Sequence, residues 1–136
     1  MSRVTDKHKG DEEDAAQLKF GSGFQDEITL RNMLTISEVK LLLSTIEAGQ
    51  VPDNAVFNKT RDYVDTFARF HNPEVVSTAR DSLPPHEFQT YEAVQLMNLC
   101  PMEAEEAKAL VPSLKMEDDK LQSHLDNLAN HRKQQG

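Results

Sequence analysis

Five histidines and one cysteine are the residues of this chain best suited to metal binding or nucleophilic chemistry. His124 and His131 lie seven positions apart within a stretch of helical spacing, so they share nearly one face of a helix and resemble half of a metal site. The chain has no HExxH pair, and no cysteine or carboxylate spacing completes the histidine pair. A solvated polar face is the preferred interpretation, and we predict neither a metal site nor any other cofactor.

Cys100 is the one thiol that could act as a nucleophile, and it stands between Leu99 and Pro101. A reactive thiol needs a base and electropositive surroundings. Its apolar neighbours favour a buried cysteine at a helix end instead. The chain also lacks the GxGxxG, GxxxxGK[ST] and GxSxG motifs, so we predict no catalytic residue. A small hydrolase or metal enzyme that uses His124, His131 or Cys100 is the alternative.

Length and composition narrow the class of protein. The chain has 136 residues, 15 basic and 23 acidic side chains, and a formal net charge of −8. This length fits about one domain. No apolar run reaches the roughly 18–20 residues that a membrane span needs, so we predict no contact with a membrane. The N-terminus lacks the apolar core of a signal peptide, and a single cysteine favours a reducing compartment.

The acidic balance argues against a dedicated duplex-DNA binder, because phosphate neutralisation dominates such affinity. The basic residues that could contact nucleic acid are interleaved with acidic ones. A free-standing module that binds single-stranded nucleic acid is therefore an alternative and not the preferred interpretation. The candidate residues for such contact are Lys108, Lys115, Lys120, Arg132 and Lys133.

Apolar residues at helical spacing predict six helices, and hence an all-α helical bundle. The first helix begins after Thr35, which forms a capping box with Glu38, and it ends near Gly49. Its apolar stripe is predicted to consist of Ile36, Val39, Leu42, Leu43 and Ile46. The second helix begins near Asp53 or Asn54, and the third begins at Pro73 after Asn72. The remaining three are predicted over 86–99, 102–111 and 117–133.

A short strand is predicted over 17–21, because Leu18 and Phe20 alternate with polar residues. A lone strand is not stable without a neighbour, so either its partner strand lies on another chain or the segment is coil. Leu18, Phe20, Phe24 and Leu41, which lies off the first helix's stripe, have no place in a core made only of helices. Apolar surface of this kind indicates an interface with another protein. The polar segment 1–14 is predicted to be disordered.

Two consecutive segments carry a family resemblance. LMNLCP at 96–101 and EEAKALVPSL at 105–114 resemble the family of subunit four of eukaryotic RNA polymerase II. EEDAAQLKF at 12–20 and TFARF at 66–70 agree with it. The motif NLCP at 98–101 favours the polymerase II family over the equivalent subunit of RNA polymerase III, which is an alternative.

The resemblance implies a non-catalytic stalk subunit of DNA-directed RNA polymerase II. It would form a heterodimer with subunit seven, attach to the core enzyme, act in transcription initiation and contact RNA through the heterodimer. It would also link transcription to messenger export and decay, in the nucleus and with the cytoplasm as a second location.

The resemblance also implies an architecture. A C-terminal helical domain over 51–136 would be similar to the helicase-and-RNase-D C-terminal fold. The segment 15–50 would hold the first helix and a strand added to a sheet of subunit seven. The expected partner-binding residues are Ala16, Leu18, Phe20, Phe24, Leu41 and Leu42.

Overall fold

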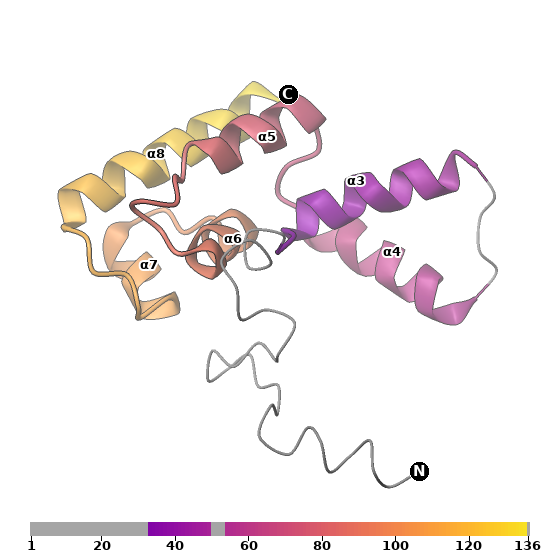
Figure 1. Ribbon diagram of the computed structural model, residues 1–136, viewed down its shortest axis with the longest axis horizontal. Helices are drawn as coiled ribbons and strands as arrows, with labels where there is room; N and C mark the ends of the chain where they lie inside the picture. Colours follow the sequence, from indigo (N-terminus) through magenta and orange to yellow (C-terminus); the bar gives the residue numbers. More distant parts are fainter. Residues whose placement is uncertain (1–32, 50–53, 136) are drawn as a thin grey trace, which may run out of the picture. The chain divides into compact units, whose positions relative to one another are not determined.

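The computed structural model describes residues 33–49 and 54–135, which contain six α-helices (Figure 1). The chain divides into two compact units, and all of these residues except Met33 belong to the second, Leu34–Gly136. The helices are α3 (Ile36–Glu47), α4 (Ala55–Phe67), α5 (Pro73–Asp81), α6 (Thr90–Leu99), α7 (Ala104–Leu110) and α8 (Asp118–Gln134). No strand occurs in the described ranges, so the all-α class is confirmed there.

The described residues leave four parts of the predicted architecture untested. The tail over 1–14 and the strand over 17–21 lie outside the described residues. The likeness of the C-terminal helices to the helicase-and-RNase-D C-terminal fold stays a prediction, as do the domain boundaries at 14 and 50.

Side-chain caps fix where the first three described helices begin. Thr35 Oγ1 accepts a hydrogen bond from the Glu38 amide at 3.1 Å, and Glu38 Oε1 accepts one from the Thr35 amide at 2.8 Å. The predicted capping box is therefore confirmed. Asn54 and Asn72 cap α4 and α5 through their side-chain oxygens, and Pro73 occupies the first position of α5 as predicted.

The main hydrophobic core is built largely from α5, α6, α7 and α8 and the loops beside them. α8 lies alongside both α5 and α7 (Figure 1). One face of α8 is apolar and buried, with Leu121, Leu125 and Leu128 at helical spacing. Phe70, in the connection from α4 to α5, and Leu96 of α6 are fully buried in the same cluster.

Two helices are shorter than the sequence pattern predicted. α6 begins at Thr90 rather than at 86, because the chain first makes a turn in which the Glu87 and Phe88 amides both donate to the Pro84 carbonyl. α7 begins at Ala104 rather than at 102. On α7 Ala104 and Ala107 are buried, whereas Leu110 is 48% exposed.

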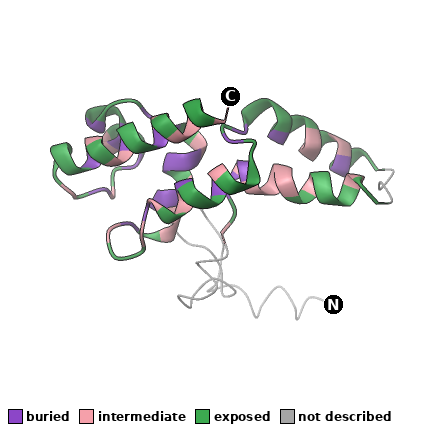
Figure 2. Cartoon of the chain, turned by 90° about the horizontal axis from the view of Figure 1, so that it is seen from above, coloured by how far each residue is buried: buried purple, intermediate pink, exposed green. Residues whose placement is uncertain are grey.

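The α3 and α4 helices run antiparallel, side by side (Figure 1), and much of their surface is exposed (Figure 2). The apolar stripe predicted for α3 is only partly buried: Ile36, Val39 and Leu43 are half-buried, whereas Leu42 is 52% exposed and Ile46 is 44% exposed. Ser37 is buried instead, and Leu41, four positions on and therefore on the same face, packs against the core. The expectation that Leu41 lacks a place in the core is also wrong.

The aromatic and apolar residues of α4 and the segment after it divide into a buried set and an exposed set. Phe57 and Val64 are buried, as is Phe70 beyond the helix end. Tyr63 and Phe67 are exposed, and their ring centroids lie 4.7 Å apart on the outer surface.

Candidate partner-binding surface

Polar side chains from distant segments fix the N-terminal end of α3. The Ile36 amide donates to Asn98 Oδ1 at the end of α6, at 2.9 Å. Ser37 Oγ accepts from the Phe70 amide at 3.0 Å. Because these bonds satisfy groups that would otherwise be buried without partners, the core-facing side of α3 can be polar. The apolar Leu42 then lies on the outer side.

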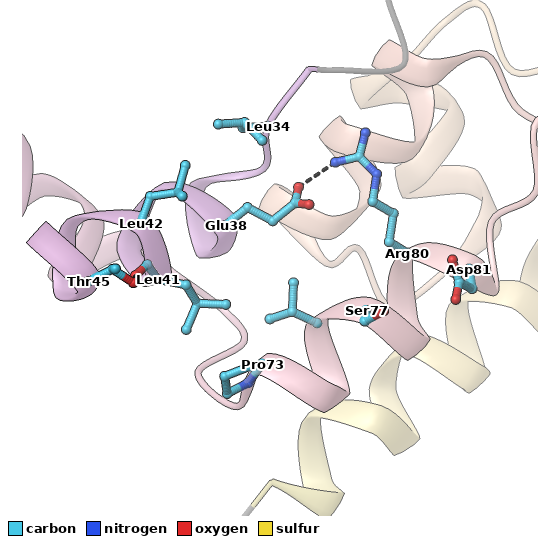
Figure 3. Close-up of a pocket in the computed structure, with 10 residues that line it drawn as sticks. Leu34, Glu38, Leu41, Leu42, Thr45, Pro73, Ser77, Arg80 and Asp81 are labelled. Atoms are coloured by element: carbon cyan, nitrogen blue, oxygen red, sulfur yellow. Dashed lines mark hydrogen bonds and ion pairs between the residues drawn. The ribbon is translucent and has the colours of Figure 1, made fainter. Parts of the chain in front are cut away.

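A groove opens between α3 and α5, with a volume of about 370 Å³ (Figure 3). Leu41 and Leu42 lie on its α3 side, and Pro73 and Ser77 lie on its α5 side (Figure 3). We call it the α3–α5 groove. Its lining residues are Leu34, Glu38, Leu41, Leu42, Thr45, Pro73, Val76, Ser77, Arg80 and Asp81.

The rim of the α3–α5 groove is charged. Glu38 Oε1 forms an ion pair with Arg80 Nη1 across the groove (Figure 3), and the two side chains are 22% and 23% exposed. The same Glu38 oxygen accepts the Thr35 amide of the capping box. One carboxylate therefore holds both the start of α3 and the link to α5, and the ion pair lies beside the leucines of the groove.

Apolar side chains also gather outside the groove. Of the nine large hydrophobic residues that are exposed in the described part of the chain, six lie on α3, on α4 or directly before α3. We call these six the exposed apolar set: Leu34, Leu42, Ile46, Val56, Tyr63 and Phe67. Exposed apolar surface of this density is typical of a protein–protein interface.

The structure describes two of the six predicted partner-binding residues. Leu41 and Leu42 both line the α3–α5 groove, although Leu41 also packs against the core. The other four, Ala16, Leu18, Phe20 and Phe24, lie outside the described residues. The sequence did not indicate Pro73 or Arg80 as neighbours of α3, because only the tertiary fold brings α5 beside it.

His124, one of the candidate metal ligands, joins α8 to the turn before α6. His124 Nε2 lies 2.9 Å from Glu87 Oε2, and its ring meets Phe88 edge-on with centroids 4.9 Å apart. Within residues 33–49 and 54–135, no three potential ligands come together to hold a metal ion.

None of the helices in residues 33–49 and 54–135 has the length and apolar character needed to cross a membrane.

Cys100 is buried at the end of α6, as predicted. Burial raises the pKa of the Cys100 thiol above its ordinary value, against the opposing charges of Arg132 and Arg69. Cys100 also adopts a left-handed conformation, with φ 46° and ψ 56°, which ends α6 before Pro101. Two residues of the NLCP motif thus have structural roles: Asn98 accepts a hydrogen bond from the first amide of α3, and Cys100 ends α6.

Known proteins are similar in sequence to this chain over most of its length. A family model described as RNA polymerase Rpb4 matches residues 33–132. The DNA-directed RNA polymerase II subunit rpb4 of Schizosaccharomyces pombe is 42% identical over 131 residues, covering 90% of this chain and 93% of that protein. The Dictyostelium discoideum subunit rpb4 is 37% identical, covering 90% and 91%. Subunit 4 of Arabidopsis thaliana RNA polymerase II is 36% identical, covering 88% and 93%.

Proposed function

Because this chain belongs to the RNA polymerase Rpb4 family, we propose that it is the subunit Rpb4 of a DNA-directed RNA polymerase II and acts in transcription. The observation that carries this proposal is the similarity to three polymerase II subunits over nearly their full lengths. All three relatives are subunits of polymerase II, which favours polymerase II over the equivalent subunit of polymerase III. In this role the chain is an accessory subunit of a nuclear enzyme, and other subunits form the phosphodiester bonds.

The proposed direct partner is subunit seven, in a stalk heterodimer that attaches to the core polymerase. The support lies in the α3–α5 groove and in the exposed apolar set, which offer apolar surface beside a fixed ion pair. An apolar side chain of the partner would enter between Leu42 and Pro73. The segment 17–21 would add as a strand to a sheet of the partner, with Leu18 and Phe20 as its buried pair.

The heterodimer would act in transcription initiation and contact the emerging RNA. It would also link transcription to messenger export and decay, which gives the cytoplasm as a second location. These roles rest on the family resemblance in the NLCP and EEAKALVPSL segments. The net charge of −8 supports the proposal that the partner supplies the basic surface for most RNA contact.

The test is Leu42→Asp, measured as the affinity of the full chain for subunit seven by isothermal titration calorimetry. Because burial of a leucine contributes about 1.5–3 kcal/mol, we expect the affinity to fall at least about tenfold. The matched control is Leu110→Asp, since Leu110 is similarly exposed at 48% but lies on α7, outside the exposed apolar set.

Far-UV circular dichroism should show the same helix content for both variants. An unchanged affinity of Leu42→Asp would remove α3 from the proposed interface. Phe20→Asp tests the strand in the same assay, and a loss with Phe20→Asp alone would place the contact entirely in the N-terminal segment.

A further inference from the structure

A second groove, with a volume of about 520 Å³, lies at the C-terminal end of α8. Three separate segments line it: the connection from α4 to α5, the connection from α6 to α7, and the last turns of α8. We call it the basic groove. Its lining residues are Arg69, His71, Met102, Ala129, Arg132, Lys133 and Gln135.

Gln135 ties the connection between α4 and α5 to the end of α8. Its Nε2 donates to the Arg69 carbonyl at 2.9 Å, and its Oε1 accepts from the His71 amide at 2.8 Å. The backbone that carries Arg69 is therefore held beside the helix that carries Arg132. The cations of the groove are brought together by the fold before any ligand binds.

The cations of the basic groove lack the ion pairs that most other lysines and arginines of the described chain form. Lys108 lies 2.6 Å from Asp118, and Lys120 lies 2.6 Å from Glu87. For Arg69, Arg132 and Lys133, by contrast, no carboxylate lies within ion-pair distance in the described part of the chain.

The dipole of α8 explains why some of these cations lie at its C-terminal end. Basic residues in the last turn of α8 are stabilised by the negative end of the helix dipole, which accounts for Arg132 and Lys133. It does not account for Arg69, which lies on a different segment and is held there by Gln135. Although the net charge of the chain is −8, three cations without a carboxylate partner among the described residues line one groove.

We propose that the basic groove binds a phosphorylated serine or threonine on an extended segment of another protein. Guanidinium groups bind phosphate oxygens in bidentate fashion, and Arg clusters are a recurrent mode of phosphopeptide recognition. Met102, which is 61% exposed, and Ala129 supply apolar contact for side chains beside the phosphate. This site is separate from the α3–α5 groove, so its test is independent of the proposed contact with subunit seven.

RNA is the less favoured ligand of this groove. Single-stranded nucleic acid is usually bound by aromatic side chains on which bases stack, and neither Phe nor Tyr nor Trp lines the basic groove. The ring of His71 lies with its Nδ1 3.2 Å from Lys40 Nζ. The overall charge of −8 also repels a long polyanion more than a single phosphate group.

The experiment measures fluorescence anisotropy of labelled probes with the full chain at low salt. The probes are a short Gly-Ser peptide with one central phosphoserine, the same peptide without phosphate, and an oligouridine of matched length. We expect the phosphopeptide to bind most tightly. Arg69→Gln and Lys133→Gln should each weaken its binding about tenfold, as the loss of a charge-assisted hydrogen bond predicts.

The control variants are Lys59→Gln and Lys115→Gln, which remove equally exposed cations outside the groove and should leave the affinity unchanged. Arg132 is left intact because its charge also acts on the Cys100 thiol, and thermal melts check the fold of every variant. The proposal is overturned if the phosphate makes no difference to peptide binding. It is equally overturned if the groove variants bind the phosphopeptide like the control variants, or if oligouridine binds more tightly and is lost with the same variants.

Discussion

Glu87 connects two basic side chains of α8 to the turn that precedes α6. Its Oε1 lies 2.6 Å from Lys120 Nζ, and its Oε2 lies 2.9 Å from His124 Nε2. The hydrogen bond from Lys120, with smaller contributions from the charges of Lys120 and His124, lowers the pKa of Glu87 below its ordinary value, while burial opposes this. One carboxylate thereby uses both of its oxygens to hold two turns of α8.

The first prediction concerns Glu87→Gln. A carboxyl group whose pKa is lowered by folding stabilises the protein at pH values above its ordinary pKa, and that stability is lost as the pH falls through its lowered pKa. We expect wild type to have a higher melting temperature than Glu87→Gln at neutral pH, and the difference to shrink as the pH falls below the ordinary pKa of a glutamate. Thermal denaturation across a pH series measures it.

Glu103→Gln provides the control for Glu87→Gln, because Glu103 is exposed and its side chain makes no cap hydrogen bond. Its difference from wild type should stay small at every pH. A difference for Glu87→Gln that is constant from neutral to acidic pH would contradict the role assigned to this carboxylate.

Tertiary hydrogen bonds to the start of α3 set which face of this helix is buried. Asn98 contributes a side-chain oxygen to the Ile36 amide from 62 positions along the chain. Ser37 Oγ likewise accepts a hydrogen bond from the Phe70 amide. These two bonds couple α3 to α6 and to the connection before α5, so the orientation of Leu42 depends on residues outside α3.

The second prediction is that Asn98→Ala lowers the free energy of unfolding by about 1 kcal/mol, because the Ile36 amide loses its partner in a partly buried position. Asn98→Asp is the matched comparison, since it keeps the oxygen acceptor and places a negative charge at the positive end of α3. Urea denaturation measures both. Equal losses in the two variants would show that the oxygen acceptor is not what Asn98 supplies.

The local rules of helix formation were readable in the sequence. Thr35, Asn54, Asn72 and Pro73 all occupy the cap or first-turn positions that their types predicted. The buried face of α3 was not readable, because a buried Ser37 is stable only through a bond from Phe70, 33 positions away. Helical periodicity identifies apolar stripes, and here part of that stripe lies on the outer surface.

The candidate sites were predictable to different degrees. Leu42 was expected to bind the partner because of the family resemblance, and it lines the α3–α5 groove. Arg80, on the opposite side of that groove, has no local signal that links it to α3. Likewise Arg132 and Lys133 were candidate anion contacts in the sequence, whereas Arg69 joins them only because the fold brings the two segments together.

At the scale of the whole molecule, apolar exposure is uneven. Most of the exposed large hydrophobic residues in the described ranges lie on α3, on α4 or at Leu34, two positions before α3. The core beneath α5 to α8 includes Leu96, Leu121 and Leu128, each almost fully buried. The α3–α4 pair is therefore the part of the described chain that gains most from a covering partner.

The third prediction follows from this distribution. A partner that binds only the folded chain stabilises it by about 2.7 kcal/mol when present at a hundredfold excess over its dissociation constant. We therefore expect the melting temperature of this chain to rise as the concentration of subunit seven rises. Differential scanning calorimetry measures the shift, and Leu42→Asp should reduce it. A melting temperature that does not respond to saturating subunit seven would contradict the proposed heterodimer.

The burial of Cys100 also makes this chain convenient to label. Maleimide reagents react with the thiolate, and the single native cysteine is both buried and held in its protonated form by a raised pKa. A cysteine introduced at an exposed position such as Lys59 or Lys115 would therefore take up a fluorophore selectively at neutral pH, with Cys100 left in place. Distances from α4 and from the loop before α8 to other polymerase subunits would then be accessible by energy transfer, with the left-handed turn at the end of α6 undisturbed.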